Sequence, residues 1–167
     1  VVKEIARIHD SINKIKFTGK LTELGNLHLT LKFLGGIDEE KLEEVKKRLR
    51  EIKLDKIDAK LGKAGVFSVR GNPRIVWVKI EGKGIHELQS KIDESLKDLF
   101  TLEERFMSHL TIARVKYVKD KKGFKEYMEN VSVKDVRFKI DSFKIKMSEL
   151  KPSGPIYKTL EEFDLEK

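Results

Sequence analysis

The sequence contains no cysteine and no long hydrophobic run among its 167 residues. The absence of cysteine excludes disulfide bonds and thiolate metal sites. No apolar run approaches the length that crosses a bilayer, and no segment has the layout of a signal peptide. We therefore expect a cytoplasmic protein that does not enter a membrane.

Acidic residues are outnumbered by basic ones. There are 28 acidic residues against 36 Lys and Arg, which gives a net charge of +8. A basic surface attracts polyanions and speeds the encounter with phosphate-bearing ligands. This charge favours a nucleic-acid ligand but identifies no site, because lysine-rich helix surfaces explain it equally well. At 39% hydrophobic and 38% charged residues, the chain has the composition of one globular domain or two small lobes.

Histidine is also scarce, yet two of the four histidines occur in the same short pattern. His28-Leu29-Thr30 and His109-Leu110-Thr111 share the triplet His-Leu-Thr, and the two histidines lie 81 positions apart. With four His and six Thr in the chain, random order would rarely give one His-x-Thr triplet. We interpret the duplicated triplet as functional. His9 and His86 fall in predicted helices, and we interpret both as surface or boundary residues.

Both triplets occur in alternating stretches that predict β-strands. From residue 27 to residue 33, large apolar side chains alternate with His28, Thr30 and Lys32. His109 and Thr111 likewise share one parity, opposite to their apolar neighbours. Each His and Thr should therefore point away from the apolar face. Strict alternation puts Arg114 on the face opposite His109, unless a bulge or strand end intervenes.

The order of predicted elements repeats. A helix, a strand, a helix and then strands are followed by the same series, which divides the chain near residues 82 to 84. We expect a single bilobal domain with approximate halves 1–82 and 83–167, each giving one His-x-Thr strand. Terminal strands are expected to cross between the lobes. If the halves pack about a pseudo-two-fold axis, the two polar faces line one cleft.

An imidazole and a hydroxyl two positions apart on a strand are separated by about 6–7 Å. Both can therefore contact one phosphate group. Cleavage of a phosphodiester needs a base for the attacking oxygen and an acid for the leaving oxygen, and two histidines supply that pair. A metal site is less well supported, because no Cys, His-x-His or carboxylate-rich triplet accompanies the histidines. A Ser-His-Asp triad lacks a nucleophile elbow.

Paired His-x-Thr-aliphatic motifs about eighty residues apart resemble the two-histidine phosphoesterase superfamily. Within it, the chain is most similar to the LigT-like RNA 2′,3′-cyclic phosphodiesterases, historically called 2′-5′ RNA ligases. Members usually begin with a short apolar strand that this sequence does not contain. The similarity covers nearly the whole chain and rests on residues 26–35, a predicted turn at Gly65-Val66-Phe67, Arg74-Ile75-Val76-Trp77, residues 109–115 and Gly154-Pro155-Ile156-Tyr157.

The resemblance implies an α+β fold, with two pseudo-symmetric lobes whose antiparallel sheets surround a central cleft and whose helices lie outside. It implies an RNA 2′,3′-cyclic phosphodiesterase that leaves a 2′-phosphate. His28 would be the proton donor to the leaving 3′ oxygen, and His109 the proton acceptor that activates water. Thr30 and Thr111 would hold phosphate oxygens. Arg114 matches the arginine that the family has after its second motif, a phosphate contact.

Three aromatic residues could stack on RNA bases or pack in the core. Core packing is favoured for Trp77, while both interpretations stay open for Phe67 and Tyr157, which we take as candidate substrate contacts. We expect no metal and no cofactor. The expected partner is an RNA or oligonucleotide with a 2′,3′-cyclic phosphate end, bound by a monomer.

Two other functions fit the same motifs. A non-catalytic RNA-binding module would use His and Thr as phosphate ligands and show no turnover. An enzyme with this fold could instead act on another cyclic nucleotide, or join RNA ends through a 2′-5′ linkage. Hydrolysis and joining share one transition state, so the motifs do not separate them.

Overall fold

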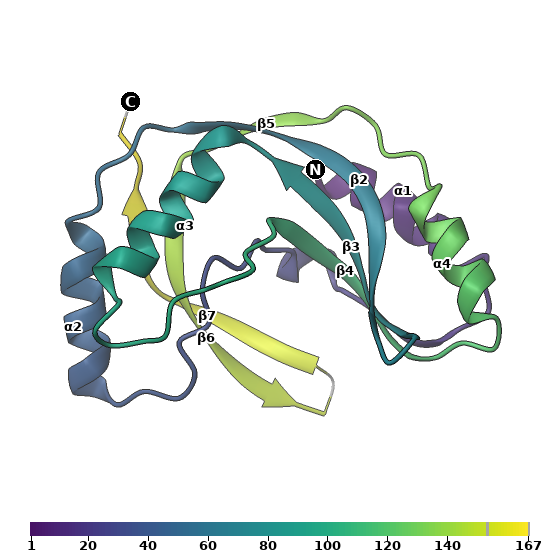
Figure 1. Ribbon diagram of the computed structural model, residues 1–167, viewed down its shortest axis with the longest axis horizontal. Helices are drawn as coiled ribbons and strands as arrows, with labels where there is room; N and C mark the ends of the chain where they lie inside the picture. Colours follow the sequence, from purple (N-terminus) through teal and green to yellow (C-terminus); the bar gives the residue numbers. More distant parts are fainter. Residues whose placement is uncertain (153, 167) are drawn as a thin grey trace. The chain divides into compact units, whose positions relative to one another are not determined.

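The computed structural model describes residues 1–152 and 154–166 as a mixture of helices and antiparallel strands (Figure 1). No helix in this part of the chain is long and apolar enough to span a membrane. The elements in chain order are α1 (Val2–Ile12), β1 (Thr18–Leu21), the 3-10 turn η1 (Leu24–Asn26), α2 (Glu39–Arg50), β2 (Ile57–Val69), β3 (Asn72–Glu81), α3 (Lys83–Ser95), β4 (His109–Tyr117), α4 (Lys121–Glu129), β5 (Arg137–Ile140), β6 (Ser142–Lys151) and β7 (Gly154–Asp164).

The chain forms two compact units, and each is assembled from three separate segments. Unit 1 contains residues 1–30, 59–81 and 107–138, and unit 2 contains residues 31–58, 82–106 and 139–167. The predicted halves 1–82 and 83–167 each contribute to both units. Both His-x-Thr triplets belong to unit 1.

Unit 1 is built on most of a five-stranded sheet with the order β1-β4-β3-β2-β5. β4 pairs antiparallel with β1 and β3, and β3 pairs antiparallel with β2. Helices α1 and α4 cover one face of this sheet (Figure 1). Ile5, Ile8 and Ile12 recur at helical spacing in α1 and are fully buried, as are Phe124 and Met128 of α4. This face of the sheet is therefore the hydrophobic core of unit 1.

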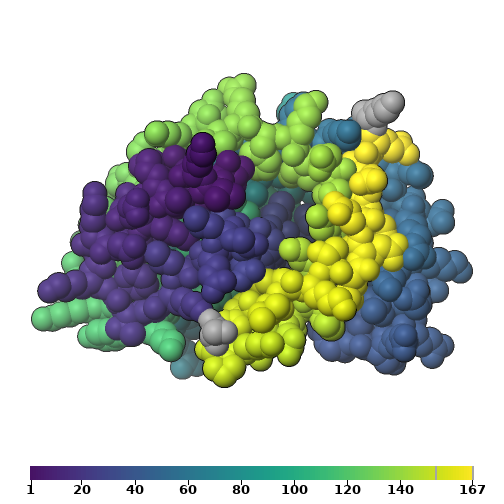
Figure 2. Space-filling model, turned by 180° about the vertical axis from the view of Figure 1, so that it is seen from behind, coloured from purple at the N-terminus to yellow at the C-terminus, as the bar shows by residue number. Residues whose placement is uncertain are grey.

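The surface of unit 1 is visible in Figure 2, where α1 (purple) lies beside the green segment that follows α4. Two polar contacts join them. Arg7 donates to the carbonyl of Ser132, and the Lys134 amide donates to the Glu4 carboxylate. The hydrogen bond from Arg7 lowers the pKa of Glu4, so this buried carboxylate stays ionised. Helix α1 is thus fixed to unit 1 by polar contacts as well as by its isoleucines.

Unit 2 combines α2 and α3 with the hairpin β6–β7. Asp38 caps α2 by accepting from the Lys41 amide at 2.8 Å. Arg50 at the other end of α2 binds both carboxylate oxygens of Glu161 in β7. The antiparallel pairings of both units confirm the predicted α+β class.

The structure corrects two local predictions. Gly65-Val66-Phe67 is not a turn but lies within the continuous strand β2. The predicted strand over residues 27–33 is reduced to a single bridge at Leu29, and Phe33 is 82% exposed although its parity predicted burial. The alternation fails because Lys32 turns inward to polar partners. Its ammonium lies 2.5 Å from the Asp93 carboxylate and 2.7 Å from the Thr101 carbonyl.

The Lys32–Asp93 ion pair is nearly enclosed, with side chains only 7% and 10% exposed. Burial raises the pKa of the Asp93 carboxyl, but hydrogen bonds from Lys32, the Glu103 amide and Gln89 outweigh burial and hold that pKa below its ordinary value. Removing one partner of a buried pair leaves an uncompensated charge. The pair therefore fixes the segment that follows the first triplet to α3 of unit 2.

We predict that Asp93→Asn lowers the free energy of unfolding by about 3–4 kcal/mol, because Lys32 would stay buried without a counter-charge. Urea denaturation followed by circular dichroism measures this loss. The matched control is Glu94→Gln, which breaks the exposed Glu94–Lys97 pair and should change the unfolding free energy by less than about 1 kcal/mol. Equal losses in the two variants would contradict the prediction.

Acid should weaken the wild type more than Asp93→Asn. A carboxyl whose pKa is lower in the folded state stabilises fully above its unfolded pKa, and the stabilisation is lost as the pH falls through the folded value. Between about pH 5 and pH 2, the wild type should lose unfolding free energy more steeply than the variant. If the unfolding free energies of the wild type and of Asp93→Asn fell in parallel as the pH was lowered, Asp93 would not contribute to acid sensitivity.

Candidate active site

One antiparallel bridge, between Leu29 and Leu110, brings the two triplets side by side in unit 1. In such a pairing, His28 lies opposite Thr111 and Thr30 lies opposite His109. Directly opposed residues have their Cβ atoms about 4.5–5.5 Å apart and on the same face. The two His-x-Thr pairs are therefore crossed, each histidine next to the threonine of the other triplet.

The four polar side chains lie on the face away from the core. Leu110 is buried, whereas His28, Thr30, His109 and Thr111 are all half-buried. At the second triplet the predicted parity is observed, since Leu110 and Ile112 are buried. At the first triplet Leu29 is half-buried like His28 and Thr30, and the direction of its side chains follows from the bridge to Leu110. Half-buried side chains remain accessible to a ligand and are partly shielded from water, which strengthens their electrostatic effects.

Each histidine ring is oriented by a backbone carbonyl two residues earlier. Nδ1 of His28 lies 2.7 Å from the Asn26 oxygen, and Nδ1 of His109 lies 2.7 Å from the Met107 oxygen. A carbonyl oxygen only accepts hydrogen bonds, so Nδ1 carries a proton in both rings. Nε2 is then the nitrogen that changes protonation state. The two triplets thus present their histidines in the same tautomer and on the same face.

Arg114 reaches this face because β4 contains a bulge. Val76 pairs with Ala113 and Trp77 pairs with Thr111, which leaves Ile112 as an extra residue on β4. Ile112 and Ala113 are both fully buried, and the next residue, Arg114, is exposed. The extra residue shifts the alternation by one position. Arg114 therefore shares the face of His109 and Thr111, which strict alternation does not allow.

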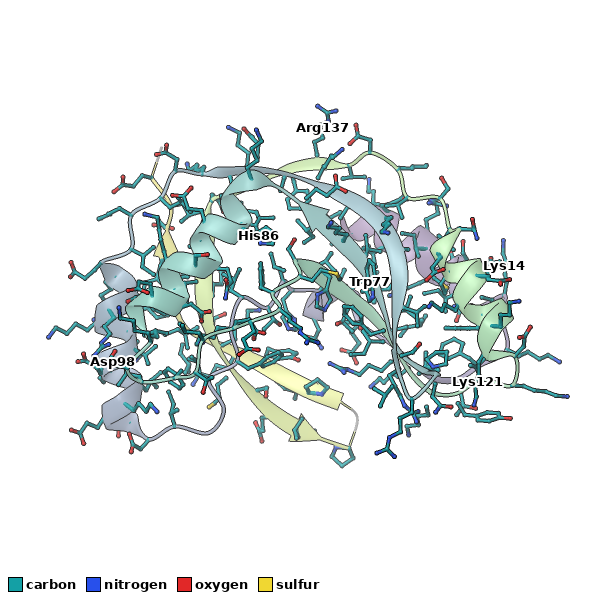
Figure 3. All side chains as sticks on the ribbon, in the orientation of Figure 1. Lys14, Trp77, His86, Asp98, Lys121 and Arg137 are labelled. Carbon is teal, nitrogen blue, oxygen red and sulfur yellow. The ribbon has the colours of Figure 1, made fainter. Side chains whose placement is uncertain are left out.

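Aromatic packing supports the second triplet. The Phe67 ring meets His109 edge-on with 5.2 Å between ring centroids, and it lies 5.3 Å from the Trp77 ring. Gly65 pairs with Trp77, and a Cβ at Gly65 would collide with the indole, so glycine allows this ring to lie over β2. Trp77, labelled in Figure 3, is 8% exposed, so it is buried as predicted, but it pairs with Thr111 and therefore packs on the face of the triplets.

Tyr157 belongs to β7 of unit 2, so it is not part of the cluster in unit 1. Its ring has the Lys146 ammonium 6.0 Å from its centroid. Base stacking by Tyr157 stays a prediction. Among the described residues there is no group of three His, Cys, Asp or Glu side chains that could hold a metal ion.

Sequence reasoning missed two features of the site. Lys79 pairs directly with His109 across β3 and β4. Period-two alternation along residues 74–81 is the signal that could have found it, because Lys79 has the parity of Trp77. Lys20 of β1 similarly pairs with Arg114.

His9, which we predicted to be a surface or boundary residue, is instead buried at 8% exposure. His86 lies exposed in the first turn of α3, as predicted (Figure 3).

Known proteins of one family match nearly the whole chain. A family model described as LigT like Phosphoesterase matches residues 1–77 and 79–157. A Methanocaldococcus jannaschii protein named RNA 2′,3′-cyclic phosphodiesterase is 36% identical over 166 residues, covering 98% of this chain and 93% of that protein. A Thermotoga maritima protein of the same name is 33% identical over 172 residues, with coverage of 99% and 90%.

Solved structures share the fold. The protein TT0787 of Thermus thermophilus superimposes with a TM-score of 0.76 at 27% identity, covering 97% of this chain and 91% of that one. Escherichia coli LigT complexed with 3′-AMP gives a TM-score of 0.74 at 20% identity, with coverage of 100% and 94%. The family model spans nearly the whole chain, and the curated relatives exceed 30% identity over almost their full length. The chain therefore belongs to the LigT-like phosphoesterase family.

Proposed function

We propose that this chain hydrolyses 2′,3′-cyclic phosphates at RNA ends to 2′-phosphates, with His28 and His109 as its two proton-transfer groups. The proposal is supported by the relatives named RNA 2′,3′-cyclic phosphodiesterase. The observation that carries the mechanism is the crossed pairing around the Leu29–Leu110 bridge. It gives two histidines of the same tautomer on one face, each with a hydroxyl beside it.

The reaction needs one proton removed and one proton supplied. Nε2 of His109 accepts a proton from water as the water oxygen attacks phosphorus. The bond from phosphorus to the 3′ oxygen breaks, and protonated Nε2 of His28 donates its proton to that oxygen. The product is a 2′-phosphate and a free 3′-hydroxyl. Proton exchange with water then restores both rings.

The other polar groups of this face stabilise charge on phosphorus. Thr30 and Thr111 hydroxyls donate to non-bridging oxygens, each from beside the histidine of the other triplet. Arg114 binds the same oxygens through its guanidinium group. Lys79, next to His109, adds a second cation to this face. Phe67 limits the rotation of His109 by its edge-on contact, and Phe67 and Tyr157 are proposed to stack on bases.

We also propose that residues 1–167 act as a single bilobal domain and as a monomer in the cytoplasm. Each compact unit is assembled from three segments separated in the sequence, so neither unit corresponds to a continuous piece that could fold first. The four triplet residues all come from unit 1 of one chain. The expected partner is RNA that ends in a 2′,3′-cyclic phosphate.

We predict that His28→Ala and His109→Ala each lower kcat for cyclic-phosphate hydrolysis by about 10²–10⁴-fold, because each removes one proton-transfer group. Release of 2′-phosphate from a short RNA measures kcat. His86→Ala is the matched control, since His86 is an exposed histidine of unit 2, and its kcat should equal that of the wild type. Full activity in either triplet variant would exclude the mechanism.

A sulfur atom in place of the bridging 3′ oxygen should separate the acid from the base. A thiolate leaves without protonation, so the modified substrate no longer needs a proton donor. We predict that it restores most of the lost rate in His28→Ala but none in His109→Ala, measured in single-turnover reactions. If the modified substrate rescues His109→Ala instead, His109 is the acid and His28 is the base. If it rescues neither variant, His28 is not the acid.

A further inference from the structure

Helix α1 contacts the bulge of β4 through one buried side chain. His9 is 8% exposed, and its Nε2 lies 2.8 Å from the carbonyl oxygen of Ile112. Because a carbonyl oxygen only accepts, Nε2 of His9 donates this hydrogen bond. His9 belongs to α1, the helix that covers the core face of the sheet (Figure 1). The triplet side chains lie on the opposite face.

The acceptor of this hydrogen bond is the extra residue of the bulge. Ile112 lies between the paired positions Thr111 and Ala113 and has no partner of its own on β3. Its carbonyl instead accepts two hydrogen bonds, from His9 and from the Thr22 amide at 2.9 Å. Bulges leave one residue outside the ladder, and a buried carbonyl there needs other donors. His9 and Thr22 supply them.

We propose that His9 is a positioning residue, which fixes the bulge at Ile112 and thereby holds Arg114 on the face of His109 and Thr111. The inference rests on the proposed function in one respect, namely that Arg114 binds the phosphate. The buried position of His9 and its orientation toward Ile112 follow from its contacts alone. Its donated hydrogen bond connects helix α1 to Ile112 of β4, two positions before Arg114.

Two substitutions separate the hydrogen bond from the volume of the ring. His9→Phe keeps a buried ring and loses the donor, whereas His9→Gln keeps an N–H at a similar distance from the backbone. With an RNA that ends in a 2′,3′-cyclic phosphate, His9→Phe should lower kcat/KM about tenfold, because Arg114 would no longer be held beside the phosphate. His9→Gln should restore the value to within about threefold of the wild type.

The link to Arg114 is tested by a double-mutant cycle with Arg114→Ala. If His9 acts through Arg114, then His9→Phe should cause little further loss of kcat/KM in the Arg114→Ala background. A merely structural role would lower the melting temperature and reduce kcat/KM by the same factor in both backgrounds. The proposal would be overturned if His9→Phe lowered kcat/KM by the same factor in both backgrounds, or if His9→Phe kept full activity.

Amide hydrogen exchange tests the same inference without turnover. In His9→Phe, exchange at Ala113 and Arg114 should be faster than in the wild type, and His9→Gln should restore slow exchange. Unchanged exchange would overturn the role of His9 even if the enzyme is active. If the wild type does not hydrolyse the RNA, the proposed function fails, while the exchange rates still decide whether His9 fixes the bulge.

Discussion

The arrangement of the candidate active site depends on the antiparallel bridge between Leu29 and Leu110. Because side chains alternate along extended backbone, this one pairing decides which residues of the two triplets meet. A shift of the register by one residue would turn His28 and Thr30 toward the core and bring Leu29 outward. The pairing of half-buried Leu29 with buried Leu110 therefore determines which polar side chains meet on the opposite face.

A second constraint acts a few residues later in the same strand. The bulge at Ile112 reverses the alternation of β4, so that an arginine follows the triplet on the same face instead of entering the core. Two fully buried residues in succession, Ile112 and Ala113, mark the place where this happens. Strand β4 thus supplies an imidazole, a hydroxyl and a guanidinium to one face. Hydrogen bonds from His9 of α1 and from the amide of Thr22, the residue after β1, satisfy the carbonyl of Ile112 behind it.

The sequence predicted the direction of the triplet side chains, because period-two alternation is a local property. It also predicted the α+β class. It could not predict the crossed register, which a single long-range bridge determines, or the inward turn of Lys32, which depends on Asp93 and Thr101 far along the chain. His9 was misjudged for the same reason, since its acceptor is 103 residues away. Local patterns therefore identified the groups, and long-range contacts arranged them.

We propose that two histidines of one face transfer protons to and from a single cyclic phosphate at an RNA end. The most direct measurement incubates the wild-type protein with an RNA that ends in a 2′,3′-cyclic phosphate and identifies the product by phosphorus NMR. We expect turnover to the 2′-phosphate alone, since the 3′ oxygen is the leaving group. Accumulation of the 3′-phosphate, or binding without turnover, would contradict it.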